Sequence, residues 1–216
     1  MRNVALAVGP RTMESATRIL RDGGVVAFPT DTVYGLGAHA LLEPAVARIF
    51  RVKGRPAHLP LPLLLADISE MSSVAEHVSA LAWRLAARFW PGGLTLVLPR
   101  ASRVPALVAG GGSSIAVRVP GHPVPRALVR SLGAPIIGTS ANLSTRPSPV
   151  TARQIEEQLG GAVDLIIDGG PCPGGFESTV LDLTGAEPGI VREGAVSRRE
   201  LERAIAESSS IAGGAG

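Results

Sequence analysis

The only lysine of the chain, Lys53, lies in a short basic segment, Lys53-Gly54-Arg55-Pro56, and all other basic residues are arginines. A lysine among so many arginines indicates a position where a compact, mobile charge is needed instead of a planar fork, as in phosphate binding. Two neighbouring cations also repel each other unless an anion joins them. We therefore predict that Lys53 and Arg55 bind an anion, with a solvated surface segment as the alternative.

Two further segments place hydroxyl and amide groups directly after apolar strands. Residues 29–37 read Pro-Thr-Asp-Thr-Val-Tyr-Gly-Leu-Gly, and residues 138–144 read Gly-Thr-Ser-Ala-Asn-Leu-Ser. Ligands bind at strand ends in α/β folds, so both segments are candidate binding loops. Ser140 and Asn142 point the same way if the backbone stays extended. The alternative is a pair of polar turns that satisfy their own backbone groups.

Two arginines lie within or beside predicted strands. Arg118 shares one strand face with Ser114, and an arginine there is costly to bury without a partner. It should therefore face a carboxylate, which belongs either to the protein or to a ligand. A last cluster joins Ser178 to Arg192 across a turn, for which a surface ion pair at a strand edge is an equal alternative.

Other site types are excluded by the residues that they need. The histidines at 39, 58, 77 and 122 have no metal-ligand spacing, so we expect no protein metal site. Cys172 is the only cysteine, which excludes an intramolecular disulfide, and no histidine base is evident beside it. The chain also lacks a Gly-x-x-x-x-Gly-Lys-Ser/Thr phosphate loop and a Gly-x-Ser-x-Gly elbow.

Length and composition predict one soluble, cytoplasmic domain. The chain has 216 residues, a net charge of +3 and no apolar run long enough to span a membrane. Aromatic residues make up only 3%, which argues against base-stacking platforms for nucleic acid. We expect a single domain over residues 1–207 and a flexible tail over residues 208–216.

Short apolar runs alternate with helical patterns, which indicates an α/β fold. Strands are expected at residues 25–28, 61–65, 94–98, 115–119, 135–138, 165–167, 179–183 and 189–192. Helices are expected at residues 13–22 with Thr12 as the cap, and at 44–52, 78–89, 123–132, 151–159 and 197–206. The strands outnumber those of strict βαβ alternation, so we expect a twisted mixed parallel/antiparallel sheet with packed helices.

Six segments together resemble the YrdC-like threonylcarbamoyl-adenylate synthases, in the same order and from about residue 12 to about residue 206. They are residues 29–37, Lys53-Gly54-Arg55-Pro56, Phe89-Trp90-Pro91-Gly92, Val117-Arg118-Val119-Pro120, Ser140-Ala141-Asn142-Leu143-Ser144 and Ser178-Thr179-Val180. The resemblance implies a YrdC/RibB-like fold in the short form with a single catalytic domain. Family members often carry Asn and His where this chain aligns Leu59 and Leu64, and Thr145 replaces a usual glycine.

The resemblance also implies a nucleotidyltransferase reaction. L-threonine, bicarbonate and ATP, with Mg²⁺, would give threonylcarbamoyl-AMP and pyrophosphate, and a partner complex would transfer the threonylcarbamoyl group to tRNA. By position, Thr32, Arg118, Ser140 and Ser178 would hold L-threonine. ATP would bind to Lys53, Arg55, Ser114, Asn142 and Arg192, with Lys53 and Arg55 as the catalytic cations.

Two alternatives to this function stay open at the level of the sequence. A double-stranded RNA or tRNA-binding module would use the same basic surface without ATP turnover, and a weak RNA contact is also compatible with the synthase. A related enzyme could instead form an adenylate with another amino acid such as serine, because hydroxyl partners alone do not select threonine.

Overall fold

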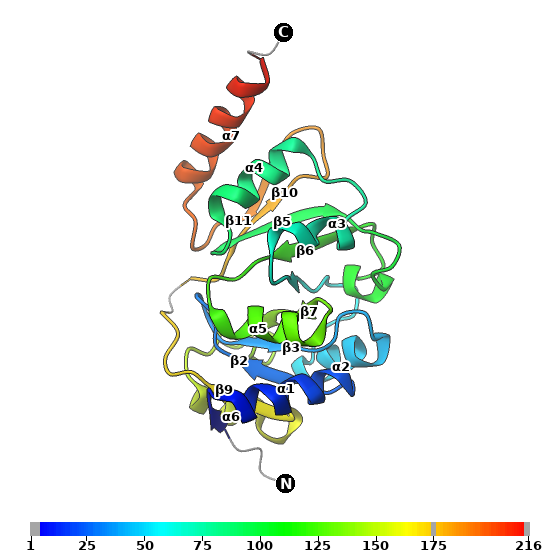
Figure 1. Ribbon diagram of the computed structural model, residues 1–216, viewed down its shortest axis with the longest axis vertical. Helices are drawn as coiled ribbons and strands as arrows, with labels where there is room; N and C mark the ends of the chain where they lie inside the picture. The colour runs from blue at the N-terminus through cyan, green and yellow to red at the C-terminus, as the bar shows by residue number, and fades with distance from the viewer. Residues whose placement is uncertain (1–4, 174–175, 214–216) are drawn as a thin grey trace.

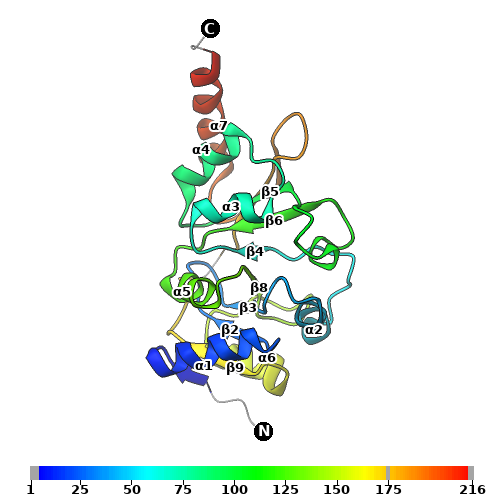
Figure 2. The ribbon, with the colours of Figure 1, turned by 45° about the vertical axis from the view of Figure 1, so that its right-hand side comes forward.

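The computed structural model describes residues 5–173 and 176–213, and it forms two stacked parts with a β-sheet in each (Figure 1). The N-terminal end of the described chain lies at one extremity of the molecule and the C-terminal helix at the other (Figures 1 and 2). No helix within the described residues is long and apolar enough to cross a membrane.

Both sheets mix parallel and antiparallel pairs, which confirms the expected α/β class and mixed strand directions. The first sheet has the order β1 (Ala5–Ala7), β9 (Leu165–Asp168), β2 (Val26–Phe28), β3 (Gly35–Gly37) and β8 (Thr139–Ser140). The second has the order β11 (Gly189–Arg192), β10 (Thr179–Asp182), β5 (Leu94–Pro99), β6 (Ser114–Arg118), β4 (Leu63–Leu64) and β7 (Ile136–Ile137). The strands form two sheets and not the single sheet predicted from the sequence, because the sequence pattern does not reveal which strands pair across long stretches of chain.

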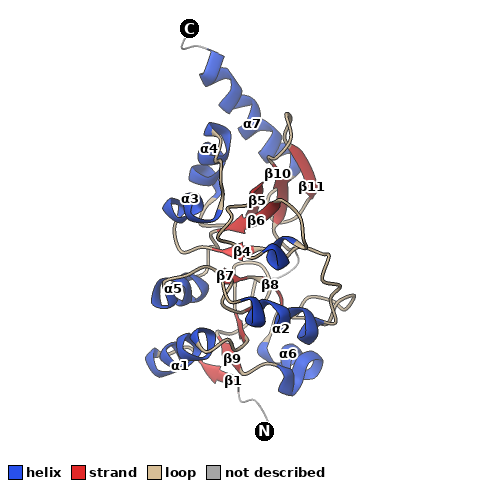
Figure 3. Cartoon of the chain, turned by 90° about the vertical axis from the view of Figure 1, so that its right-hand side faces the viewer, coloured by secondary structure: helices blue, strands red, loops and turns tan. Residues whose placement is uncertain are grey.

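Helices cover both faces of the first sheet and one side of the second (Figure 3). On one side lie α1 (Pro10–Arg21) and α5 (Pro123–Leu132), which pack against each other, and on the other lie α2 (Glu43–Lys53) and α6 (Ala152–Leu159). The second sheet is flanked by α3 (Met71–Val74) and α4 (Ala80–Phe89), and α7 (Arg198–Gly213) packs against α4.

One hydrophobic core joins the two sheets. Leu36 of the first sheet belongs to the same buried cluster as Leu96, Val117 and Ile137 of the second. The chain crosses between the sheets at Gly138, which separates β7 from β8. A Cβ atom at Gly138 would overlap with the side chain of Leu64, so only glycine fits at this crossing.

Two helices depart from their expected boundaries by more than two residues. The first helix begins at Pro10 with Gly9 as its N-cap, and the Thr12 hydroxyl instead donates a hydrogen bond to the Ala7 carbonyl at 2.9 Å. Proline at the first helical position has no N–H to satisfy, which explains the earlier start. The last helix runs from Arg198 to Gly213 and so continues beyond the expected end at residue 206, whereas residues 214–216 lie outside the described part.

Candidate active site

A cavity of about 170 Å³ lies between the two sheets. Residues of β3 and β8 in the first sheet form part of its wall, and residues of β4 and β6 in the second form another part. Its lining comprises Thr30, Thr32, Val33, Tyr34, Gly35, Arg55, Pro62, Leu64, Arg118, Gly138, Thr139, Ser140, Glu177, Ser178 and Arg192. The two binding loops predicted from the sequence therefore meet here, although 100 residues of chain lie between them.

Most of the predicted site residues gather around this cavity. All four residues assigned to L-threonine line it, as do Arg55 and Arg192. Lys53 and Asn142 lie directly behind the Ser140 wall, where the Lys53 ammonium contacts both Ser140 and Asn142. Ser114 does not line the cavity, because it stands at the opposite end of β6 from Arg118, about 13 Å away at the rise of a β-strand.

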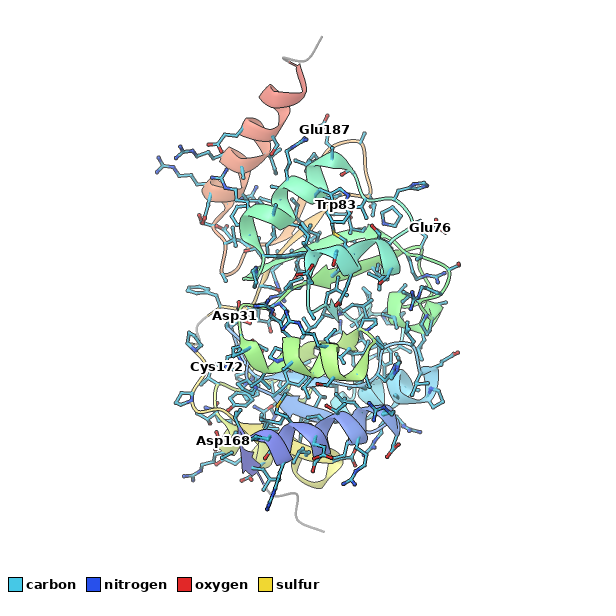
Figure 4. The ribbon with its side chains drawn as sticks, in the orientation of Figure 1. Asp31, Glu76, Trp83, Asp168, Cys172 and Glu187 are labelled. Carbon is cyan, nitrogen blue, oxygen red and sulfur yellow. The ribbon has the colours of Figure 1, made fainter. Side chains whose placement is uncertain are left out.

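Arg118 is almost completely buried and is held by three groups of the protein. Its Nη2 atom donates to Asp31 Oδ1 at 2.7 Å, Nη1 donates to Thr32 Oγ1 at 3.2 Å, and Nε donates to the Gly92 carbonyl at 2.8 Å. Burial lowers the pKa of Arg118, while the charge of Asp31 acts in the opposite direction. The carboxylate that the sequence left unassigned is therefore the protein's own Asp31, which lies at the junction of the two parts (Figure 4).

The hydrogen-bond direction of Thr32 is fixed by its neighbour Thr30. The Thr30 hydroxyl donates to the Val33 carbonyl at 2.6 Å, so its single proton is already used. The two threonine hydroxyls lie 3.0 Å apart, and Thr32 must therefore be the donor between them. Thr32 consequently presents only a lone pair to the cavity and acts there as an acceptor.

Lys53 is the last residue of α2 and only 2% exposed, which excludes the solvated alternative. Its Nζ atom donates to the Ser140 carbonyl, to the Asn142 carbonyl at 2.8 Å and to Asn142 Oδ1 at 2.9 Å. Burial, aided by repulsion from Arg55, lowers the pKa of Lys53 to about 8. Because an ammonium group has three donors, these contacts use all of them and fix the Ser140–Asn142 wall in place.

Gly54 ends α2 directly after the buried Lys53 and lets the chain turn back toward the surface. Its φ of 58° lies in the left-handed region and ends α2, so the chain reverses directly after the lysine. Arg55 then turns toward the cavity, where its Nη2 atom donates to the Pro60 carbonyl at 3.0 Å. Burial lowers the pKa of Arg55, and the charge of Glu177 opposes this effect.

Glu177 lines the cavity, although no role was predicted for it from the sequence. Its carboxylate pairs with Arg192 and accepts a hydrogen bond from the Ser148 hydroxyl at 2.8 Å. Arg192 also donates to the Ser178 carbonyl at 2.9 Å, so the predicted ion pair and the predicted site contact coexist. The only signal in the sequence was the adjacency of Glu177 to Ser178.

Tyr34 anchors the glycine-rich segment that follows β9 to the cavity wall. Its hydroxyl donates to the Gly170 carbonyl at 2.8 Å and accepts from the Gly169 N–H at 3.2 Å. Burial raises the pKa of Tyr34 to about 12, so the phenol stays neutral. Cys172, in the same segment, is buried, and burial raises the pKa of its thiol. It is not among the residues that line the cavity.

The described residues contain no group of three or more His, Cys, Asp or Glu side chains that could hold a metal ion. Glu177 in the cavity lining is paired with Arg192, and Asp31, which is not part of that lining, is paired with Arg118. Mg²⁺ usually keeps several waters and binds through one or two carboxylates together with substrate phosphates. The donor set therefore fits a Mg²⁺ ion that arrives with a nucleotide better than a resident metal.

Comparison with curated proteins identifies relatives of this chain. The threonylcarbamoyl-AMP synthase of Pyrococcus abyssi is 46% identical over 192 residues, which cover 89% of this chain and 56% of that protein. The Bacillus subtilis protein of the same name is 41% identical over 201 residues, which cover 93% of this chain and 58% of that protein. The chain thus spans less than two thirds of the length of these relatives.

Solved structures agree with this relationship. The structure of Pyrococcus abyssi Sua5 complexed with L-threonine has a TM-score of 0.90 at 44% identity and covers 95% of this chain and 60% of that one. Escherichia coli YciO has a TM-score of 0.81 at 34% identity and covers 89% and 96%. A family model described as Telomere recombination, for the Sua5, YciO and YrdC proteins, matches residues 18–194. The chain therefore belongs to the Sua5/YciO/YrdC family.

Proposed function

We propose that this protein forms threonylcarbamoyl-AMP and pyrophosphate from L-threonine, bicarbonate and ATP. The observation that carries the proposal is the cavity itself, where Arg118 is pre-positioned by Asp31 beside the hydroxyls of Thr32 and Ser178. A guanidinium next to hydroxyl groups suits the carboxylate and hydroxyl of an amino acid. The relative with TM-score 0.90 was solved with L-threonine, which supports the same ligand here.

The proposed reaction has two bond-forming steps. Bicarbonate loses hydroxide to give CO₂, and the threonine amine attacks the CO₂ carbon to form an N-carboxylate; the proton that the amine loses combines with the hydroxide to give water. An oxygen of this carboxylate then attacks the α-phosphate of ATP, and the bond to the β-phosphate oxygen breaks to release pyrophosphate. Since two anions must approach each other, charge neutralisation and positioning are the main catalytic needs.

The chain's cations have separate tasks in this scheme. Arg55 and Arg192 face the cavity and are the groups that phosphate oxygens would meet, whereas Lys53 holds the Ser140–Asn142 wall and adds positive charge from behind it. A phosphate oxygen that binds Arg192 competes with Glu177, which pairs with the same guanidinium. Mg²⁺ bound with ATP would neutralise further phosphate charge. The product would pass to a tRNA threonylcarbamoyl-transferase complex in the cytoplasm.

The test is pyrophosphate release from ATP with each amino acid, with and without bicarbonate. Release that requires both L-threonine and bicarbonate supports the proposal, and serine should be about tenfold to a few hundredfold less efficient because it lacks one methyl group. Arg118→Ala should abolish release, and Arg153→Gln, an exposed change on α6, should not alter it. Absence of release with any amino acid, from a folded protein, refutes the proposal.

The RNA-binding alternative is not favoured, because the curated relatives are named as synthases. A module of that kind would show salt-sensitive RNA affinity and no bicarbonate-dependent turnover.

A further inference from the structure

Thr95 is a buried hydroxyl residue of β5 that neither the sequence patterns nor the cavity lining assigns to the site. It is 3% exposed and lies between Leu94 and Leu96, which point into the hydrophobic core from the opposite face of the strand. Valine would serve as well as threonine for strand formation and packing at such a position. The hydroxyl group therefore calls for an explanation beyond packing.

The Thr95 hydroxyl donates to the Ser178 hydroxyl oxygen at 2.8 Å. Its direction follows from the general rule that a buried hydroxyl proton finds an acceptor, since Ser178 Oγ is the acceptor within reach among the described residues. β5 and β10 are parallel neighbours, and their register pairs Thr95 with Val180. Ser178 lies two residues before Val180 along the chain, so its contact with Thr95 runs diagonally between the two strands. This places Ser178, the residue before β10, beside Thr95.

The proton of Ser178 is consequently left for the cavity. Ser178 is 9% exposed and lines the cavity, and its oxygen already receives the Thr95 proton, with Arg192 Nη2 at a longer 3.5 Å. Among the described residues Ser178 Oγ is found only as an acceptor, from Thr95 and from Arg192, and it donates no hydrogen bond to the protein. Ser178 therefore presents a donor, whereas Thr32 presents an acceptor because Thr30 has fixed its direction.

We propose that Thr95 is a positioning residue that holds the Ser178 hydroxyl as a hydrogen-bond donor toward an oxygen of the amino-acid substrate. The inference rests on the proposed function, and it assigns opposite hydrogen-bond polarity to two hydroxyls of the cavity. A substrate carboxylate or hydroxyl oxygen can accept from Ser178, and a substrate N–H or O–H can donate to Thr32. Without Thr95 the Ser178 hydroxyl is free to rotate away from the cavity.

A double-mutant cycle tests this role. Thr95→Val, Ser178→Ala and the double variant are compared for L-threonine affinity by calorimetry and for kcat/KM of pyrophosphate release. Thr95→Val should weaken both by about five- to tenfold, as expected for one well-placed hydrogen bond, and leave the KM for ATP unchanged. Thr95→Ser, which keeps the hydroxyl, should stay within about twofold of the wild type. In the Ser178→Ala background, Thr95→Val should have no further effect.

Thr17→Val is the matched control for removing a buried threonine hydroxyl. Thr17 is 7% exposed and donates to the Met13 carbonyl within α1, outside the cavity lining. The Thr17→Val variant should shift Tm about as much as Thr95→Val does, and its affinity for L-threonine should equal that of the wild type.

The outcomes separate this inference from the proposed function. If Thr95→Val reduces L-threonine affinity equally in the wild type and in Ser178→Ala, Thr95 acts through packing. That result would overturn the role of Thr95 and leave the proposed function intact. If the wild type binds L-threonine but releases no pyrophosphate, the proposed function is overturned. The double-mutant cycle measured in L-threonine affinities then still decides the role of Thr95. A wild type that binds no L-threonine overturns both.

Discussion

Replacing Lys53 by methionine should remove a pH dependence of stability that this single side chain creates. In the folded protein burial lowers the pKa of Lys53 from 10.5 to about 8. The unfolded chain therefore binds more protons between these two pH values, and the free energy of unfolding should rise with pH in that window. At 1.36 kcal/mol per pKa unit, the gain approaches about 3 kcal/mol by pH 10.5. Lys53→Met has no ammonium to titrate and should lack this rise.

Urea denaturation of both proteins from pH 7 to pH 10, followed by tryptophan fluorescence, measures the difference. Cys172 and Tyr34 also titrate at high pH, and burial raises the pKa of both, which acts in the opposite direction. Since both groups are common to the two proteins, the wild-type minus variant difference isolates Lys53. Because Lys53 is the only lysine, its side-chain NMR resonance also gives a direct titration. Parallel stability curves, or a Lys53 midpoint near 10.5, would refute the reasoning.

Two further predictions concern the carboxylates that pair with the arginines of the cavity. Asp31→Asn leaves the Arg118 guanidinium buried without a counter-charge. In urea titrations it should therefore lower the free energy of unfolding by about 3–5 kcal/mol, and the affinity for L-threonine should fall. A variant as stable as the wild type would show that the ion pair is not needed for stability. Glu177→Gln weakens the ion pair through which Glu177 competes with a phosphate for Arg192. The KM for ATP should therefore fall, by at most about fivefold because the pair is partly exposed. A raised KM would mean that Glu177 assists ATP binding.

The sequence predicted most elements of the fold because their local signals are strong. The helix predicted at residues 123–132 and the strand at residues 189–192 coincide with α5 and β11. The strands that escaped prediction, β1, β3 and β8, have two or three residues each, too few for an alternating pattern. Their pairing depends on partners far away in the chain, which is also why the division into two sheets was not foreseen.

For the site, residue types were predicted more successfully than contacts. The rarity of lysine in the chain indicated that the region of Lys53 is functional. The three protein oxygens that Lys53 contacts from the end of α2 could not be predicted, because they depend on how residues 138–144 fold against the helix. The cost of burying Arg118 correctly required a carboxylate, but Asp31 could be identified only once the loop after β2 was placed beside β6.

Of the properties of this cavity, the direction of its hydrogen bonds is the hardest to predict from the sequence. A serine or threonine hydroxyl can donate or accept, so its residue type alone leaves the direction open. The direction is set where a second hydroxyl has only one available acceptor, as Thr95 has in Ser178. That contact exists because β5 and β10 are parallel neighbours, although Thr95 and Ser178 are 83 positions apart in the sequence. The chemistry that the cavity offers to a ligand is thus decided by strand pairing, and a substitution buried behind the wall can change it without touching the ligand.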